Sequence, residues 1–321
     1  MSRSEASISA NAIGVVIPVY NRPRLILDAL DSVSRQTIKP SKIVVVDDGS
    51  EDDTRESVGK WVANHPEINV ELLAQDHAGV SNARNGGIAR LADFPFLAIP
   101  DSDDLWPDDF LERSLDKLNA CPEAVAVSSD RLYQSGESSR LNSLAELSAD
   151  PVLWMIRNGG ALISCTLFRT RALLDAGPFP LHIRSGQDSY VFMRLARLGK
   201  WLHLPGNPVI YRPGGSGVGE EQQLSRKFHD SRLRWAENYD EFVRQFPAKT
   251  PALQMQWQKA MGHRWKITGH HYRKQGFLET AVHCYRRSYE TDPTTMAFLR
   301  LARAHIARLF GFGDSAKAPP D

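Results

Sequence analysis

Short apolar runs alternate with amphipathic segments over the first hundred residues. Four runs are short and apolar, and each stops at a polar or Pro-containing turn: residues 13–20, 42–46, 70–73 and 94–99. Such runs indicate buried strands. Apolar residues recur at helical spacing between them, in residues 25–36, 54–64 and 81–91. This alternation predicts an α/β fold, with a mostly parallel sheet covered by helices on both faces.

The pattern changes after residue 107. We expect a helix over 110–120, a strand over 124–129, a strand over 164–169 and a helix from Gln187 to Leu198. A Gly-rich loop over 212–219, which we interpret as mobile, marks a boundary. Almost no strand signal follows it. Four helical segments are predicted instead: 222–245, 255–275, 278–290 and 294–310.

These segments predict two domains with short tails. We expect a flexible N-terminus (1–11), an α/β domain (12–221), an all-α C-terminal region (222–311) and a disordered tail (312–321). Small residues within the C-terminal region, Gly269, Gly276 and Ala281, are spaced as in one tetratricopeptide repeat. One such repeat cannot bury its own faces, so we expect a helical hairpin packed on the first domain.

Charge is distributed unevenly over a chain whose total is close to neutral. Residues 222–321 hold 17 Lys and Arg against 9 Asp and Glu, a net charge of +8, whereas residues 1–221 hold 22 against 29, a net charge of −7. The basic part can therefore face an anionic surface, such as the inner face of a membrane, although solvated charged faces explain the difference equally well. We expect no nucleic-acid partner.

The three cysteines are far apart and form no paired spacing, which suits a reducing cytoplasm. The first residues lack an apolar core of signal-peptide length, and no run approaches the roughly 20 apolar residues that span a bilayer. We therefore expect a cytoplasmic protein, with peripheral membrane contact through the basic C-terminal helices as a further expectation.

Three polar turns follow strands of the predicted sheet: Pro18-Val19-Tyr20-Asn21, Asp47-Asp48-Gly49-Ser50 and Asp101-Ser102-Asp103-Asp104. Ligands of open α/β sheets bind at the carboxyl ends of the strands, so we expect the turns to form one site. Three carboxylates within four residues repel one another unless a cation lies between them. Mg²⁺ bridges carboxylates to phosphates. The turns therefore predict a metal–diphosphate site, whereas each taken alone could be a plain turn or helix cap.

Individual roles follow from side-chain chemistry. Pro18 and Tyr20 could shape a slot for a flat base, and Asp48 could accept a hydrogen bond from a base N–H. Asp101 could hold ribose hydroxyls, while Asp103 holds the metal against the diphosphate. Asp104 could cap the helix that follows.

A further segment, residues 77–87, opens a helix with Arg84 and Asn85. Either side chain could contact the nucleotide or its phosphates, and structural capping is the alternative.

The ordered motifs resemble those of family 2 glycosyltransferases. They are Val16-Ile17-Pro18-Val19-Tyr20-Asn21, Val45-Val46-Asp47-Asp48-Gly49-Ser50-x-Asp52, Gly79-Val80-Ser81-x-Ala83-Arg84-Asn85-x-Gly87, and Asp101-Ser102-Asp103-Asp104. The resemblance covers about residues 12–215. It implies a GT-A fold and an inverting transfer of a sugar from a nucleotide-diphosphate donor, with Mg²⁺ or Mn²⁺, onto a glycan or lipid-linked acceptor in cell-surface polysaccharide or glycolipid synthesis.

The resemblance also carries roles over by position. Asp48 matches the base-binding Asp, and Asp101 with Asp103 matches the Asp-x-Asp pair for ribose and metal. Pro18, Tyr20, Asn21, Arg84, Asn85 and Ser102 complete the expected nucleotide-sugar site. Inversion needs a general base behind the acceptor hydroxyl. Asp188 matches the family's base, before Arg194-Leu195-Ala196.

Two departures from the family pattern concern acceptor and metal. Gln187 stands where relatives have Glu beside the base, so acceptor binding there relies on a neutral amide. Pro213 follows Tyr211-Arg212 where many relatives have a His, which leaves the third protein ligand of the metal unassigned. A nucleotidyltransferase and a non-catalytic scaffold with a relict transferase domain are the alternative functions.

Overall fold

The structure is a computed structural model that describes residues 8–135, 138–159, 163–183, 185–212 and 231–309. Within the sequence predictions, residues 1–7, most of the Gly-rich loop, the beginning of the helix 222–245 and the tail 312–321 lie outside these ranges. The described chain divides into two compact units. Unit 1 comprises residues 1–149 and 161–223, and unit 2 comprises 150–160 and 224–321.

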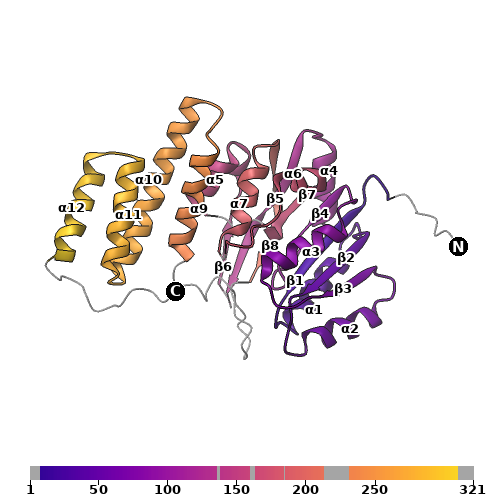
Figure 1. Cartoon of the computed structure of the whole chain (residues 1–321). Coiled ribbons are helices and arrows are strands. Elements are labelled where there is room, and N and C mark those ends of the chain that lie inside the picture. The colour runs from indigo at the N-terminus through magenta and orange to yellow at the C-terminus, as the bar shows by residue number, and fades with distance from the viewer. Residues whose placement is uncertain (1–7, 136–137, 160–162, 184, 213–230, 310–321) are drawn as a thin grey trace. The chain divides into compact units, whose positions relative to one another are not determined.

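Unit 1 is built on one eight-stranded sheet (Figure 1). Its strands are β1 (Ile13–Val19), β2 (Lys42–Asp47), β3 (Val70–Ala74), β4 (Phe96–Ala98), β5 (Ala124–Ser135), β6 (Ser138–Asn142), β7 (Thr166–Arg169) and β8 (Lys200–Tyr211). They are ordered β3-β2-β1-β4-β7-β5-β6, and β8 pairs with β5. The first four are mutually parallel, whereas β7 is antiparallel to both β4 and β5. The predicted mostly parallel α/β sheet is confirmed.

Helices and short turns of helix connect these strands: α1 (Leu25–Ser34), α2 (Thr54–Asn64), α3 (Val80–Arg90), α4 (Phe110–Asn119), η1 (Ala145–Ser148), η2 (Ile163–Cys165), α6 (Thr170–Ala176) and α7 (Gln187–Leu195). Every residue of β1 is buried. An all-apolar run of seven residues therefore becomes a central strand covered on both faces, as its lack of alternation predicts.

Strand β8 was not predicted from the sequence. Its segment contains Pro205, Gly206 and Pro208, which normally argue against a strand. The structure accommodates them outside the ladder: the register with β5 passes from Ser129–Leu204 to Arg131–Val209, so residues 205–208 bulge. β5 likewise runs beyond the predicted end, into a hairpin with β6.

Unit 2 consists of α5 (Pro151–Asn158), α9 (Ser231–Gln245), α10 (Pro251–Lys274), α11 (Leu278–Thr291) and α12 (Thr295–Leu309). Its helical character confirms the predicted all-α region, while the finer resemblance to a tetratricopeptide repeat remains a prediction. A Cβ on Gly269 would lie 2.8 Å from a ring carbon of Tyr285, so a small residue lets α10 and α11 approach closely. Helix α5 lies inside the range 12–221 assigned to the first domain, yet it packs with α10.

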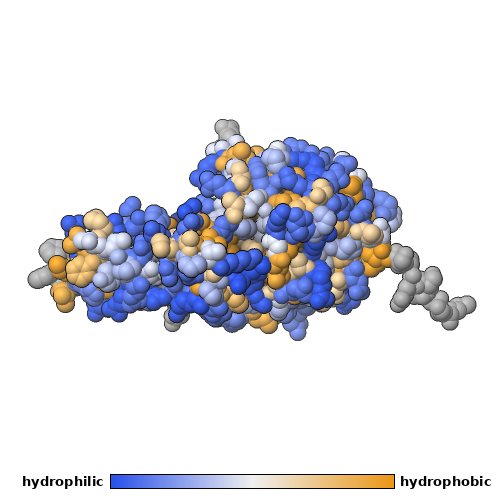
Figure 2. Space-filling model, turned by 90° about the horizontal axis from the view of Figure 1, so that it is seen from above, coloured by the Kyte–Doolittle hydropathy of each residue, from blue (hydrophilic) through white to orange (hydrophobic). Residues whose placement is uncertain are grey.

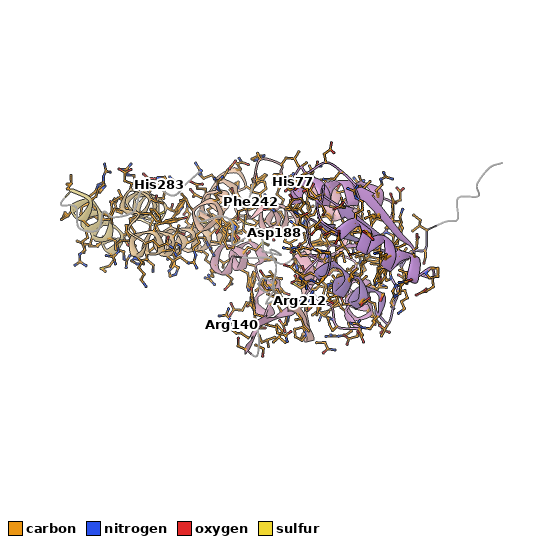
Figure 3. The ribbon with its side chains drawn as sticks, turned by 90° about the horizontal axis from the view of Figure 1, so that it is seen from below. His77, Arg140, Asp188, Arg212, Phe242 and His283 are labelled. Atoms are coloured by element: carbon orange, nitrogen blue, oxygen red, sulfur yellow. The ribbon has the colours of Figure 1, made fainter. Side chains whose placement is uncertain are left out.

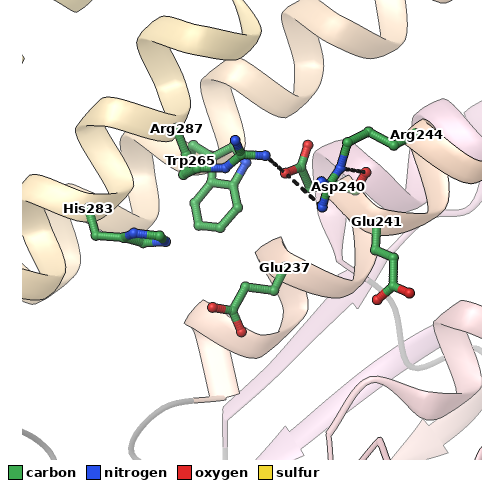
Figure 4. A pocket seen from close by; sticks show the side chains of 7 residues that line it. All are labelled: Glu237, Asp240, Glu241, Arg244, Trp265, His283 and Arg287. Atoms are coloured by element: carbon green, nitrogen blue, oxygen red, sulfur yellow. Dashed lines mark hydrogen bonds and ion pairs between the residues drawn. The ribbon is translucent and has the colours of Figure 1, made fainter.

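A pocket of 240 Å³ opens in unit 2 among α9, α10 and α11 (Figure 4). Among its charged side chains, Asp240 pairs with both Arg244 and Arg287. Arg287 forms an ion pair with the buried Asp240 and a second one, of 2.7 Å, with Glu290. The same guanidinium lies 5.8 Å from the ring centre of Trp265. The ion pair between Asp240 and Arg287 therefore joins α9 to α11 at this pocket.

Among the residues that the structure describes, none of the helices combines the length and the apolar character that crossing a bilayer demands.

The close approach of α3 to the sheet leads to a stability prediction. A Cβ on Gly87 would lie 2.3 Å from Cγ1 of Val16, whereas a Cβ on Gly86 would make only ordinary contact, 3.5 Å from the amide oxygen of Gln75. We expect Gly87→Ala to lower the free energy of unfolding by about 1–3 kcal/mol, because α3 must move off the strand. Gly86→Ala, the matched control, should raise it by up to about 1 kcal/mol through helix propensity.

Urea unfolding of both variants measures the difference. Equal stability of the two would mean that α3 yields to an added methyl group without cost and that the contact is not tight.

Candidate active site

The loops that follow β1, β2 and β4 meet at the carboxyl edge of the sheet, as the sequence predicts. The backbone N–H of Asn21 donates to Oγ of Ser50 at 2.9 Å, and the side-chain oxygen of Asn21 accepts from the backbone N–H of Glu51 at 2.9 Å. Asn21 has φ +50°, a left-handed conformation that Asn tolerates better than most residues. Asn21 therefore fixes the first loop against the second.

Three carboxylates gather where β4 ends. Asp101, Asp103 and Asp104 each offer an oxygen atom, and these atoms lie within 4.8 Å of one another. Asp103 and Asp104 are buried, while Asp101 is partly exposed. Burial, and then the charges of its two neighbours, raise the pKa of Asp104 well above its usual range. Oδ2 of Asp104 is buried and has no hydrogen-bond partner among the described residues.

This donor set fits a hard divalent cation. Oxygen ligands from carboxylates are those that Mg²⁺ and Mn²⁺ take, and the unpartnered oxygen of Asp104 is an acceptor without a donor. The expected capping role of Asp104 is wrong, because α4 begins at Phe110 with Asp109 as its N-cap. Asp104 is instead a candidate for the protein ligand that the sequence left unassigned.

Arginines from distant parts of the chain neutralise this cluster. Nη1 of Arg22 lies 3.0 Å from Oδ2 of Asp103 and donates to Oγ of Ser102 at 3.1 Å. Nη2 of Arg84 lies 2.8 Å from Oδ1 of Asp101. The cluster is thus held by cations that sequence analysis had not paired with it.

A third arginine, Arg212, directly follows β8 and is labelled in Figure 3. Nε of Arg212 donates to the carbonyl oxygen of Asp103 at 2.5 Å, and its backbone N–H donates to Oδ1 of Asp104 at 3.3 Å. Sequence analysis missed Arg22 and Arg212 as site residues. The available signal was positional: Arg22 directly follows the first polar turn, and Arg212 precedes the Gly-rich loop.

Asp48 lies at the end of β2 with its acceptor capacity filled. Oδ1 accepts from Nε2 of Gln75 at 2.7 Å and from the N–H of Ala78 at 3.0 Å. Oδ2 accepts from the N–H of Gly79 at 2.9 Å and lies 3.0 Å from Nδ1 of His77. A carboxylate has about four lone-pair sites, so a base N–H would have to replace one of these donors. His77 is the most replaceable, because its side chain is 55% exposed.

Two aromatic rings, those of Tyr20 and His77, lie next to Asp48. The rings of Tyr20 and His77 stack with centroids 4.1 Å apart and an interplanar angle of 23°. Pro18 is buried in β1, opposite Val46. The stacked pair thus stands beside Asp48, where the sequence placed a flat base.

Asn85 and Arg84 lie on α3 and pack against the segment after α6. The side-chain amide of Asn85 donates to the carbonyl of Phe179 and accepts from its N–H, both at 2.8 Å. The guanidinium of Arg84 lies 5.4 Å from the centre of the Phe179 ring. Asn85 therefore clamps this segment, and Arg84 faces Asp101.

Asp188 and Gln187 begin α7, after Gly186 in a left-handed conformation. Asp188 is partly exposed and accepts the N–H of Ser189 at 2.8 Å. Burial raises the pKa of Asp188 above its usual value, the charge of Arg84 opposes that rise, and the charge of Asp101 adds to it. Asp188 is therefore close enough to the Arg84–Asp101 pair to feel both charges, whereas Gln187 is buried.

The chain resembles known proteins over most of unit 1. The model of the family described as Glycosyl transferase family 2 matches residues 14–174, half of the chain. A curated relative named chondroitin synthase, from Escherichia coli, is 26% identical over 207 residues, which are 62% of this chain and 28% of that relative. The chain thus spans well under two thirds of the relative's length.

Two solved structures are similar in fold. TarS 1–349 from S. aureus, in complex with UDP-GlcNAc, has a TM-score of 0.68 at 17% identity and covers 94% of this chain and 89% of its own. The mannosyltransferase PcManGT from Pyrobaculum calidifontis, in complex with GDP-Man and Mn²⁺, has a TM-score of 0.60 at 20% identity, with 96% and 84% covered. They confirm the expected GT-A type of α/β fold with additional helices.

Removing the buried carboxylate of Asp104 should have opposite effects on the stability of the protein and on its affinity for a metal ion. A carboxyl group whose pKa is raised in the folded state destabilises that state wherever the unfolded state is ionised, including pH 7. We expect Asp104→Asn to raise the thermal midpoint of metal-free protein at pH 7 and to weaken Mn²⁺ binding at least about tenfold. Thermal unfolding and titration with Mn²⁺ measure the two effects.

The exposed carboxylate variant Asp108→Asn is the matched control and should change neither quantity. A lower midpoint for Asp104→Asn would show that Asp104 stabilises the metal-free fold, contrary to the expected electrostatic cost.

Proposed function

Because the chain belongs to glycosyl transferase family 2, we propose that it moves a sugar from a nucleotide-diphosphate donor to an acceptor hydroxyl, with inversion at the anomeric carbon. The observation that carries this proposal is the cluster of Asp101, Asp103 and Asp104 at the carboxyl edge of the sheet, with Asp188 within electrostatic reach. Burying a carboxylate such as Asp104, whose Oδ2 has no hydrogen-bond partner among the described residues, costs free energy, and a scaffold without catalysis would gain nothing from that cost.

Asp101 and Asp103, with Asp104 as a third candidate, would hold Mg²⁺ or Mn²⁺. The solved mannosyltransferase of similar fold carries Mn²⁺, which supports this assignment. When bound, the cation supplies positive charge for the leaving diphosphate. The nucleotide would lie over Tyr20 and His77, with Asp48 holding the loop that borders the base.

Asp188 is the proposed general base. It would take the proton of the acceptor hydroxyl as that oxygen forms its bond to the anomeric carbon and the bond to the diphosphate breaks. Its raised pKa suits a base, because a more basic carboxylate abstracts a proton more readily. The charge of Arg84 opposes this rise in the pKa of Asp188. Gln187 would contribute a neutral amide to acceptor binding.

The acceptor is proposed to be a growing glycan or a lipid-linked sugar of the cell surface. This class of acceptor is supported by the name of one relative, chondroitin synthase, because chondroitin is a polysaccharide. No single base or sugar is assigned, since the solved structures of similar fold hold UDP-GlcNAc in one case and GDP-Man in the other.

The assignment of Asp188 is tested by Asp188→Asn. We expect transfer to fall by about 100-fold or more, because an amide cannot accept the proton. For the unmodified protein, the rate should fall as the pH drops through a pKa that lies above the ordinary Asp value of about 4, because only the ionised base acts. Transfer is measured with the nucleotide sugar that best stabilises the protein in a thermal screen with Mn²⁺.

Asp175→Asn, which removes an exposed carboxylate on α6, serves as the control and should retain full activity. An Asp188→Asn variant that binds donor and retains full transfer would eliminate Asp188 as the base.

Helix α12 supports a second proposal, contact of unit 2 with an anionic membrane surface. Its exposed residues include Met296, Leu299 and Ile306, which are between 42% and 55% exposed and share one face at helical spacing. Arg303 lies on the same face, and Thr295–Leu309 contains no acidic residue. Apolar atoms are visible at the surface where α12 lies, at the left of Figure 2. A terminal helix of a helical stack usually presents a polar face.

We expect the full chain to float with vesicles that contain phosphatidylglycerol and to remain unbound to phosphatidylcholine vesicles. Substitution of Met296, Leu299 and Ile306 by Ser should abolish flotation, because the apolar contact is lost. Met255→Ser on α10, which is equally exposed at 55%, is the control. Flotation that survives the triple substitution would refute the role of this face.

A further inference from the structure

Arg22 enters the carboxylate cluster from the side on which the nucleotide would lie. It follows Tyr20 and Asn21 at the end of β1, and its side chain is 12% exposed. Its backbone N–H donates to Oγ1 of Thr54 at 2.7 Å. Because the loop is tied at Asn21 and at Arg22 itself, the guanidinium is delivered to a fixed place beside Asp103.

The simplest role for Arg22 is to neutralise the buried carboxylate of Asp103. The charges around it indicate a further role, in binding an anion. In the metal-free cluster, the guanidiniums of Arg22 and Arg84 leave one of three carboxylates without a direct cationic partner. A divalent cation would bring two positive charges to a cluster in which Arg22 and Arg84 already pair with Asp103 and Asp101, so an anion would be attracted there.

We propose that Arg22 is a ligand of the donor diphosphate and a catalytic residue that stabilises the leaving group. This inference rests on the proposed function. Once a cation binds Asp103, the guanidinium no longer has that carboxylate to itself, and its N–H groups can donate to phosphate oxygens. Guanidinium matches phosphate geometry and keeps its charge at every relevant pH. As the bond from the anomeric carbon to the diphosphate oxygen breaks, the electron pair stays on that oxygen and Arg22 holds the resulting charge.

Other cations near the nucleotide loops are less suited. Arg55 is engaged by the buried Asp47, with its Nη2 2.8 Å from Oδ2 of that residue. The side chain of Arg24, two residues after Arg22, is exposed at the start of α1. Arg24 therefore offers a matched control, since Arg24→Gln makes the same chemical change two residues away.

The experiment separates metal from diphosphate. The full chain and the variants Arg22→Gln, Arg22→Lys and Arg24→Gln are titrated by calorimetry, first with Mn²⁺ alone and then with inorganic pyrophosphate at saturating Mn²⁺. We expect Arg22→Gln to bind Mn²⁺ at least as tightly as the unmodified chain, because a cation that competes for Asp103 is gone. Its affinity for pyrophosphate should fall at least about tenfold.

Arg22→Lys keeps the charge without the planar fork, so its affinity for pyrophosphate should be intermediate, and Arg24→Gln should leave both affinities unchanged. The Lys variant also keeps the test decisive if the Gln variant fails to fold. An Arg22→Gln variant that binds Mn²⁺ more tightly and pyrophosphate normally would overturn the proposal and leave Arg22 as a counter-ion. An unmodified chain that binds neither Mn²⁺ nor pyrophosphate would instead overturn the proposed function.

Discussion

Unit 1 depends on how the charge of three neighbouring, largely buried carboxylates is balanced. At separations below 5 Å and partly out of water, three ionised groups repel one another strongly. Two guanidiniums reach these carboxylates from distant parts of the chain, Arg22 after β1 and Arg84 on α3, while Arg212 after β8 binds the main-chain carbonyl of Asp103. The electrostatic demand of the site therefore also holds together the elements that surround it.

The sequence was sufficient to predict the parallel half of the sheet. β1, β2 and β4 are short apolar runs that end in polar turns, and runs of this length and flanking favour strands that are buried on both faces. β8 escaped because a bulge removes its Pro and Gly residues from the ladder, and a bulge is fixed by the neighbouring strand rather than by local preference. The grouping of α5 with later helices could not be predicted either, because it depends on tertiary packing between segments that are far apart in the sequence.

The candidate site divides in the same way. Its carboxylates follow strands directly, so their positions are local consequences of the sheet and could be predicted. Their cationic partners could not, because Arg22 and Arg212 reach the cluster across separations of about eighty and more than a hundred residues. Asn85 illustrates the same limit: the expected contact with a ligand stays a prediction, while the hydrogen bonds of its side-chain amide with the main chain of Phe179 span 94 residues and have no local signal.

The membership of α5 in unit 2 has a consequence for how the chain can be divided. The chain leaves the sheet unit after residue 149, contributes one helix to the other unit, and returns at residue 161. The apolar side chains of α5, among them Trp154 and Ile156, are buried. The guanidinium of Arg264 on α10 donates a hydrogen bond to the carbonyl of Ile156. A protein cut at the apparent boundary near residue 222 would keep α5 and lose α10, on which it packs. The two units are modular in architecture but cannot be separated by a single cut.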